Sequence, residues 1–199
     1  KYRVAFFKGC VSEFMFTDIN IATVNVLLKN ECEVITPCNQ VCCGALHIHN
    51  AETSIAKELA KKNIDVFEKL NPDAIIVNAA GCGVMLKEYP ELLKDDPEYS
   101  IRAEKFSKKV KDISEFLYNI PINEEFGEVN IKVAYHDACH LAHGQGIKTE
   151  PRELLKKIPG LELIEIPESD VCCGSGGVYN ILQPEMAKRL LKRKMDNIY

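Results

Sequence analysis

Two stretches of this chain repeat one arrangement of cysteines. Residues Pro37–Gly44 and Pro167–Gly174 both read Pro-x-x-x-Val-Cys-Cys-Gly. A single cysteine precedes each pair: 31 residues lie between Cys10 and the first pair, and 32 lie between Cys139 and the second. The chain is therefore an internal duplication with a period of about 130 residues, and the duplicated feature is a set of thiols. A packing core does not need vicinal cysteines at a repeated distance, whereas a metal or redox site does.

The composition is that of an ordinary soluble globular protein. Of 199 residues, 46% are hydrophobic and 27% are charged, and the net charge is −4. The acidic balance argues against nucleic acid as a partner. We find no apolar run of 18 residues, so we expect no membrane-spanning segment.

The nine cysteines indicate a reducing compartment. Seven belong to the repeat, and Cys32 and Cys38 are left over; we expect the first in the core and the second half-buried. Secreted disulfide scaffolds are shorter, and adjacent cysteines pair only with strain. We therefore expect a cytoplasmic protein, placed at most peripherally at the inner face of the cell membrane.

The hydrophobic pattern alternates between strands and helices. Short apolar runs predict strands at 4–7, 33–36, 74–77, 132–135 and 161–166. Apolar spacing predicts a helix from residue 17 or 18 with Ile21, Val24, Leu27 and Leu28 on its buried face, and a helix over 52–70 with Ile55, Leu59, Phe67 and Leu70 on its buried face. We expect charged helical segments throughout 83–119 and further helices from about residues 150 and 184.

This order predicts an α/β protein of two tandem duplicated halves, each a mostly parallel, Rossmann-like sheet flanked by helices. We expect the first cysteine-rich half at 1–120, a linker at 121–130 and the second half at 131–199. The second half is expected to be incomplete, because the counterpart of Cys82 would fall at about residue 212. Both ends of the chain look cut from a longer protein.

The cysteines follow the predicted strands. Ligands of parallel sheets collect at the carboxyl ends of the strands. We therefore expect the thiols of each half to converge. In the first half these are Cys10, Cys42, Cys43 and Cys82, and in the second half they are Cys139, Cys172 and Cys173.

Thiolates select zinc, copper(I) or iron–sulfur clusters. The chain has no Cys-x-x-Cys knuckle of the zinc kind and no closely spaced ferredoxin run. Vicinal thiols cannot easily chelate one small ion together, but they can serve different irons of one cluster. An iron–sulfur cluster is favoured, with zinc and a bare redox-active thiol set as alternatives.

These motifs resemble the duplicated cysteine-rich (CCG) domain of the heterodisulfide reductase B subunit, and most of all that of the glycolate oxidase iron–sulfur subunit. The matching segments cover essentially the whole chain. They are Cys42–His49, Asn78–Tyr89, Tyr135–Gly146 and Pro167–Asn180.

The resemblance implies an electron-transfer role. In that family an FAD-containing subunit oxidises glycolate, D-lactate or a similar 2-hydroxy acid, and the iron–sulfur subunit passes the electrons toward a quinone. A ferredoxin-like module normally precedes the cysteine-rich region. The chain would then be the non-flavin subunit of an oxidoreductase and would not act alone.

The resemblance also implies that the seven repeated cysteines hold [4Fe–4S] clusters. Heterodisulfide reductase relatives use five cysteines for a non-cubane cluster, but Ala79 stands where one of those five would be. Four thiols make an ordinary cubane cluster a second possibility. With only three thiols in the second half, we expect this piece to hold its clusters poorly and to lack them when isolated.

Histidines accompany both cysteine sites. His136, His140 and His143 surround Cys139, and we name the first two as candidate groups behind the thiols. A structural role, with the ring bonded to backbone, is the plainer interpretation for all three and for His47 and His49. Gly174–Gly177 suits close approach of backbone to a cluster better than a phosphate loop.

Three functions remain open at this point: electron transfer within a 2-hydroxy-acid oxidase, disulfide reduction at a cluster, and a zinc-stabilised interaction module. The sequence names neither the hydroxy acid nor the final electron acceptor.

Overall fold

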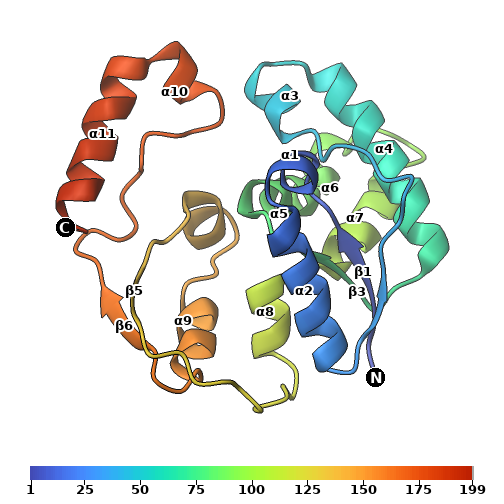
Figure 1. The fold of residues 1–199 in the computed structure, drawn as a ribbon. Coiled ribbons are helices and arrows are strands. Elements are labelled where there is room, and N and C mark those ends of the chain that lie inside the picture. The colour runs from blue at the N-terminus through green and yellow to red at the C-terminus, as the bar shows by residue number, and fades with distance from the viewer. Residues whose placement is uncertain (199) are drawn as a thin grey trace. The chain divides into compact units, whose positions relative to one another are not determined.

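The computed structural model describes residues 1–198 and divides into two compact units, Lys1–Asn123 and Glu124 onward (Figure 1). The first unit is built on a four-stranded parallel sheet in the order β2-β1-β3-β4. Its strands are β1 (Arg3–Phe7), β2 (Glu33–Ile35), β3 (Ala74–Val77) and β4 (Val110–Asp112). Its helices are α1 (Cys10–Met15), α2 (Thr17–Lys29), α3 (Ala45–His49), α4 (Thr53–Leu70), α5 (Ala80–Lys87), α6 (Tyr89–Leu92), α7 (Ser100–Lys109) and α8 (Ile113–Tyr118).

The central strand β1 is buried on both faces, as its unbroken apolar run predicts. Ala5 and Phe7 belong to the core under α4 to α7, and Val4 and Phe6 belong to the core under α2 and α8. Helices therefore cover both faces of the sheet (Figure 1), and the doubly covered parallel architecture is confirmed for this unit.

The expected buried face of α2 is only partly confirmed: Leu27 is 0% exposed and Val24 packs against the core. Ile21 and Leu28 are 54% and 53% exposed, whereas Asn20 and Thr23 are buried. Asn78, just after β3, donates from Nδ2 to Asn20 Oδ1 at 2.9 Å and to Thr23 Oγ1 at 3.0 Å. These polar contacts with the end of the sheet turn the helix away from its apolar stripe.

The buried face of α4 is shifted in a similar way. Ile55 is 44% exposed, and Leu59 and Leu70 are only half-buried. Phe67 is buried as expected, and Ala56, Ala60, Asn63 and Ile64 are buried with it. Small side chains on this face let the helix approach the loop after β2 closely.

A fourth strand interrupts the segment that we expected to be helical. Residues Val110–Asp112 pair with β3, and Val110 is 1% exposed. Asp112 then accepts a hydrogen bond from the Ser114 N–H at 2.8 Å and forms a capping box with Glu115 that starts α8. Three residues are too few for an alternating pattern to show in the sequence.

The second unit repeats the start of the first. It contains β5 (Lys132–Tyr135), a π-helix η1 (His140–Gly144), α9 (Thr149–Lys156), β6 (Glu162–Glu165), α10 (Tyr179–Leu182) and α11 (Pro184–Asp196). In the first unit Arg3 pairs with Glu33, and in the second unit Lys132 pairs with Glu162. Lys132 lies 129 positions after Arg3, and Glu162 lies 129 positions after Glu33. The same parallel register confirms that the two units are copies of one α/β plan, and the described part of the second unit carries two strands of it.

Candidate metal centre

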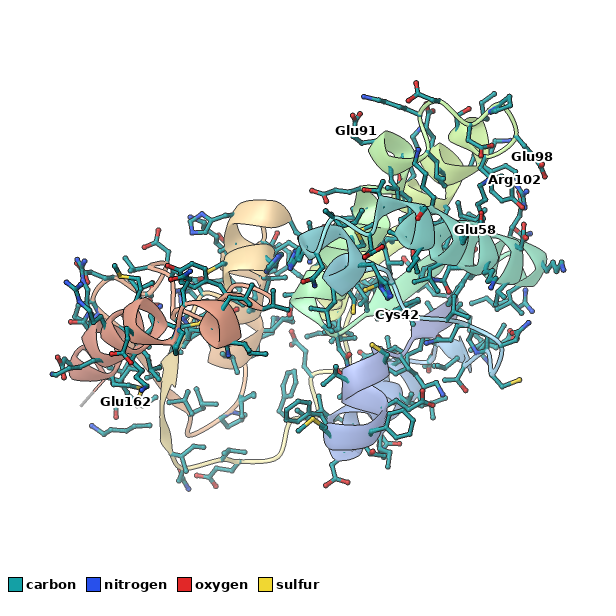
Figure 2. The ribbon with its side chains drawn as sticks, turned by 90° about the horizontal axis from the view of Figure 1, so that it is seen from above. Cys42, Glu58, Glu91, Glu98, Arg102 and Glu162 are labelled. Atoms are coloured by element: carbon teal, nitrogen blue, oxygen red, sulfur yellow. The ribbon has the colours of Figure 1, made fainter. Side chains whose placement is uncertain are left out.

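The four thiols of the first unit converge at the carboxyl end of its sheet. Cys10 begins α1 after β1, the pair Cys42–Cys43 follows β2, and Cys82 lies in α5 after β3 (Cys42 is labelled in Figure 2). The Sγ atoms of Cys10 and Cys42 are 3.7 Å apart, and those of Cys43 and Cys82 are 3.3 Å apart. The predicted convergence is confirmed for this unit.

Two glycines give the thiol loops their room. Gly44 follows the cysteine pair with φ +93°, a conformation that side chains rarely adopt, and its N–H donates to Cys42 Sγ at 3.5 Å. A Cβ at Gly9 would lie 3.5 Å from both Ala79 Cβ and Cys82 Sγ. The backbone therefore approaches the sulfurs closely at both places.

A buried polar pair fixes the first cysteine loop from behind. Asn63 Oδ1 accepts from the Val41 N–H at 3.0 Å, and its Nδ2 donates to the Cys42 carbonyl at 3.1 Å. Tyr89 accepts from Asn63 at 3.1 Å and donates to the Cys43 carbonyl at 3.0 Å. Both side chains are 0% exposed. Sequence reasoning missed them; the only signal was an asparagine inside an apolar helix stripe.

Neighbouring sulfurs and burial raise the pKa values of three thiols of the first unit. The pKa of Cys42 is raised far above its usual value by the hydrogen bond with Cys43 and by burial. The hydrogen bond with Cys42 lowers the pKa of Cys43. The hydrogen bond with Cys82 and burial outweigh it and raise this pKa to about 12. Burial and then the charge of Cys42 raise the pKa of Cys10. Because thiolates are the metal ligands, a bound soft cation would replace these protons.

The second unit gathers its thiols in the same way. Cys139 follows β5, and Cys172–Cys173 follow β6. Burial, followed by the charges of Cys172 and Cys173, raises the pKa of Cys139. Gly174, with φ +87°, donates its N–H to Cys172 Sγ at 3.3 Å, as Gly44 does in the first unit. A cavity of about 280 Å³ opens beside Cys173.

A charged cluster supports the second site. Arg152 of α9 forms a bidentate pair with the buried Asp137, at 2.7 Å and 2.8 Å, and Ser169 Oγ donates to Asp137 Oδ2 at 2.7 Å. The hydrogen bonds from Arg152 lower the pKa of Asp137 most. Burial acts in the opposite direction, and the hydrogen bond from Ser169 lowers the pKa further, to about 2. This network joins β5, α9 and the loop that precedes the cysteine pair. Sequence reasoning did not single out any of these three residues.

The expected histidines contact backbone near the second thiols. His136 Nδ1 lies 3.2 Å from the Ser169 carbonyl and 2.8 Å from Lys194 Nζ, and burial and then the Lys194 charge lower the pKa of His136. His143 Nε2 lies 3.1 Å from the Asp170 carbonyl. His140 opens the π-helix η1. In the first unit, the buried Nδ1 of His47 has no hydrogen-bond partner among the described residues.

Two cysteines stay outside the site. Cys32 is 3% exposed and packs in the core with Val4 and Phe6, as expected. Cys38 is exposed, so the expectation that it is half-buried is wrong.

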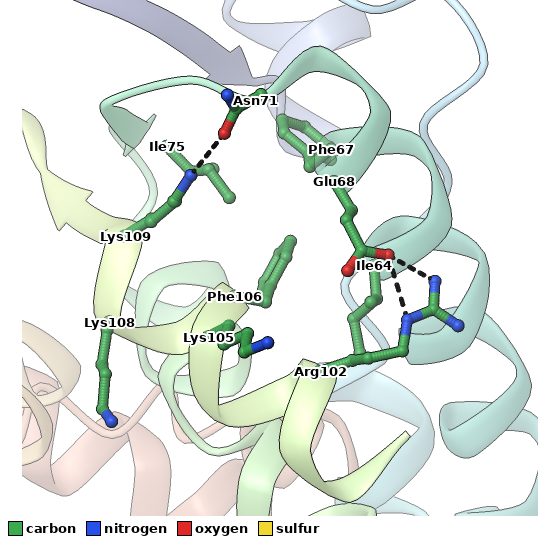
Figure 3. Close-up of a pocket in the computed structure, with 10 residues that line it drawn as sticks. All are labelled: Ile64, Phe67, Glu68, Asn71, Ile75, Arg102, Lys105, Phe106, Lys108 and Lys109. Atoms are coloured by element: carbon green, nitrogen blue, oxygen red, sulfur yellow. Dashed lines mark hydrogen bonds and ion pairs between the residues drawn. The ribbon is translucent and has the colours of Figure 1, made fainter. Parts of the chain in front are cut away.

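A large apolar hollow of the first unit lies away from the thiols, at the amino end of β3 and β4. This cavity of about 390 Å³ has Phe67 and Phe106 at its floor, and Lys105, Lys108 and Arg102 at its rim (Figure 3). Arg102 is engaged in an ion pair with Glu68 at 2.7 Å. No thiol lines the cavity, so it forms no part of the candidate centre.

The donor chemistry fits an iron–sulfur group. All nine cysteines are free, and four of them present sulfur after three separate strand ends, with the Gly44 N–H donating to one of these sulfurs. Among residues 1–198 no three His, Cys, Asp or Glu side chains have the arrangement of a single-ion site. In the same residues, no helix is long and apolar enough to cross a membrane.

The fold and the site together define the class of protein: two copies of a parallel α/β unit, each with cysteines at the carboxyl ends of its strands. The chain belongs to the cysteine-rich domain family, whose model matches residues 4–87 and 133–199. The two matched segments correspond to the two copies.

Three similar proteins carry names that refer to an iron–sulfur subunit, a reductase subunit and lactate utilization. The chain is 47% identical over 200 residues to the probable glycolate oxidase iron-sulfur subunit of Bacillus subtilis, with 98% of this chain and 44% of the relative covered. It is 40% identical to the B subunit of the fumarate reductase (CoM/CoB) of Methanothermobacter marburgensis, with 98% and 37% covered. It is 32% identical to the lactate utilization protein A of Oceanobacillus iheyensis, with 98% and 80% covered. The chain thus spans less than half the length of the first two relatives.

Proposed function

We propose that this chain is the thiol-rich part of an iron–sulfur electron-transfer subunit of a 2-hydroxy-acid oxidase. The observation that carries the proposal is the meeting of four thiols from three strand ends at one place in the first unit, with sulfur separations of 3.3 Å and 3.7 Å. The glycolate oxidase and lactate utilization relatives support the substrate class.

In this proposal the repeated cysteines are the iron ligands. Cys10, Cys42, Cys43 and Cys82 hold a cluster in the first unit. Cys139, Cys172 and Cys173 contribute to one in the second. A cluster would supply one-electron chemistry. The chain's own residues hold the sulfurs in place, bury Cys43 away from water, and donate the Gly44 and Gly174 N–H groups to sulfur. Four thiols with Ala79 beside Cys82 favour a cubane [4Fe–4S] cluster in the first unit.

The partners follow from the same reasoning. Electrons would come from an FAD-containing subunit that oxidises glycolate or D-lactate, and a ferredoxin-like module of the full-length chain would carry them toward a quinone. Nine free cysteines suit the cytoplasm, at the inner face of the cell membrane where a quinone is reduced.

Iron analysis and EPR of the anaerobic full-length protein test the proposal. We expect iron rather than zinc, and a Cys82→Ser variant that loses one cluster. A Cys38→Ser variant is the matched control, because Cys38 is exposed and outside the site. Stoichiometric zinc in place of iron would contradict the proposal.

A second function has a specific observation in its favour. The 40% identity to a component of a fumarate reductase (CoM/CoB) favours thiol–disulfide chemistry at the cluster. Assay of the full-length complex with glycolate, D-lactate and a heterodisulfide separates the two functions. Turnover of the heterodisulfide alone would favour the second.

A further inference from the structure

The two units pack their cysteine loops on equivalent helices. A Cβ placed on Gly44 would lie 3.4 Å from Ala56 of α4, and one placed on Gly174 would lie 3.0 Å from the Cα of Ala187 of α11. In both units, the left-handed glycine after the cysteine pair therefore rests on an alanine of the next helix. This contact aligns α4 with α11 residue by residue.

The alignment pairs Asn63 with Lys194. Each lies seven positions after its alanine, and each is buried, at 0% and 4% exposed. Asn63 bonds the backbone of Val41 and Cys42, and Lys194 Nζ donates to the carbonyls of Ser169 at 2.8 Å and Val171 at 2.6 Å. Equivalent helix positions thus hold the two thiol loops. The residue is a neutral amide, Asn63, in the first unit and a cation, Lys194, in the second.

Lys194 is fully bonded but not neutralised by its contacts. An ammonium has three N–H donors, and its three acceptors here are the two carbonyls and His136 Nδ1 at 2.8 Å. None of these acceptors carries a negative charge. Lys194 Nζ can only donate in its contact with His136, so Nδ1 is the acceptor there, and the Ser169 carbonyl takes its hydrogen bond from Lys194 rather than from His136. Lysine is almost never this buried without an anionic partner. The Lys194 charge acts on the carboxylate of Glu168, but that carboxylate is exposed and paired with Arg193, so a further anion at the site would stabilise the ammonium.

We propose that Lys194 is a positioning residue that holds the second thiol loop and places a buried cation behind it, where the first unit has the neutral Asn63. This inference rests on the proposed function, since the anion that it serves is a thiolate-bound iron–sulfur cluster. Reduction adds one electron to the site. A nearby fixed cation stabilises the more negative, reduced state. The buried charge of Lys194 therefore makes the centre of the second unit easier to reduce than it would be with a neutral side chain at this position.

The test uses the full-length protein, made anaerobically with its clusters. Lys194→Gln removes the charge, Lys194→Arg keeps it, and Lys192→Gln is the control on the same helix, with a side chain that is 76% exposed. A Cys82→Ser background, which lacks the first centre, assigns the signals. Iron per chain and both reduction potentials, from EPR-monitored titration, are the readouts.

We expect Lys194→Gln to disfavour reduction of the second centre at least tenfold, which is 59 mV for one electron, and to leave the first centre unchanged. Lys194→Arg should restore most of the shift, and Lys192→Gln should show none. Selective loss of iron from the second centre in Lys194→Gln, with the first intact, also supports the positioning role.

Two results overturn the inference: parental potentials at both centres in Lys194→Gln, or equal iron loss from both centres, which would reflect general unfolding. If the parent protein itself holds no iron, the proposed function fails along with the inference. If the parent holds both clusters and Lys194→Gln changes neither, only the inference fails.

Discussion

Asn63 and Asp137 bind the two thiol loops through buried polar contacts, and neither is itself a candidate ligand. Each satisfies several groups that would otherwise be buried without partners. Removing one partner of such a group costs its full desolvation penalty, whereas an exposed hydrogen bond contributes little. Single substitutions at these positions should therefore show how much each contact contributes to the free energy of unfolding of its unit.

Asn63→Ala should lower the free energy of unfolding of the first unit by about 3 kcal/mol, because the Val41 N–H, the Cys42 carbonyl and Tyr89 lose a partner. Asn50→Ala is the control. Asn50 Nδ2 donates to the Leu46 carbonyl at 2.7 Å, but the side chain is exposed, so we expect a change within about 0.5 kcal/mol. Urea denaturation followed by circular dichroism measures both. Equal effects would contradict the role of Asn63.

Asp137→Asn should destabilise the second unit by about 3 kcal/mol, because Arg152 would be left half-buried without its bidentate partner. Glu165→Gln, which removes the exposed partner of the same arginine, should cost less than about 1 kcal/mol. Chemical denaturation of both variants at pH 7 gives the comparison. A larger loss for Glu165→Gln would reverse our order.

The Asp137 pair should also give an acid dependence. Its pKa of about 2 in the folded protein lies below the usual value of 3.8, so the folded state favours the carboxylate. The resulting stability, about 2 kcal/mol, is fully present above pH 4 and is lost as the pH falls through about 2. Denaturation of the parent and Asp137→Asn at pH 5, 4 and 3 should show the difference between them shrinking toward acid.

At the scale of elements, each cysteine loop is joined to a helix through a left-handed glycine. The two joints differ in tightness. A Cβ on Gly174 would lie 2.5 Å from the Ala187 carbonyl oxygen, whereas a Cβ on Gly44 would meet nothing closer than 3.4 Å. The second loop therefore has no room for a side chain, and a side chain in the first would cost only backbone strain.

Gly174→Ala should cost more than Gly44→Ala. For Gly44→Ala we expect about 1–2 kcal/mol from the positive φ alone. For Gly174→Ala we expect at least 1 kcal/mol beyond that, because α11 must move. Gly81→Ala is the control: it lies inside α5 with nothing within 4 Å, and should stabilise by about 0.5–1 kcal/mol. Thermal unfolding of the three variants checks the order, and a Gly44 effect equal to that of Gly174 would contradict it.

At the scale of the whole molecule, thiol chemistry and folding are coupled. The first site exists only when the ends of β1, β2 and β3 meet, so anything that binds its thiolates also stabilises the fold. The raised pKa values of Cys42 and Cys43 show the cost of ionising these thiols without a bound cation.

The metal-free protein should therefore lose stability in alkali. Cys43 in the folded state keeps its proton to about pH 12, while the unfolded chain releases it near the ordinary thiol value of 9.0. Between these values the folded state binds more protons, so stability falls as pH rises, by about 1.4 kcal/mol per pH unit for each proton held. Urea denaturation under reducing, anaerobic conditions at pH 8, 9 and 10 measures the slope. The Cys42→Ser/Cys43→Ser double variant should lack it, and an unchanged slope there would contradict the assignment.

The duplication, the parallel strands and the convergence of the first four thiols could all be predicted from the sequence. Each depends on short-range patterns: unbroken apolar runs mark strands such as 4–7 and 74–77, and a repeated spacing marks two copies. Because parallel strands share a carboxyl end, cysteines that directly follow them must meet. The family's motifs then point to iron–sulfur chemistry.

Only the tertiary structure decided what surrounds the thiols. A helix pattern places Ile21 inside, but contact between Asn78 and Asn20 turns that helix, and Val110–Asp112 becomes a strand because an edge of the sheet is there to receive it. The equivalence of Asn63 and Lys194 likewise depends on which alanine each glycine rests on. Such contacts join residues far apart in the chain, and their energies come from burial and partner geometry, which no local pattern encodes.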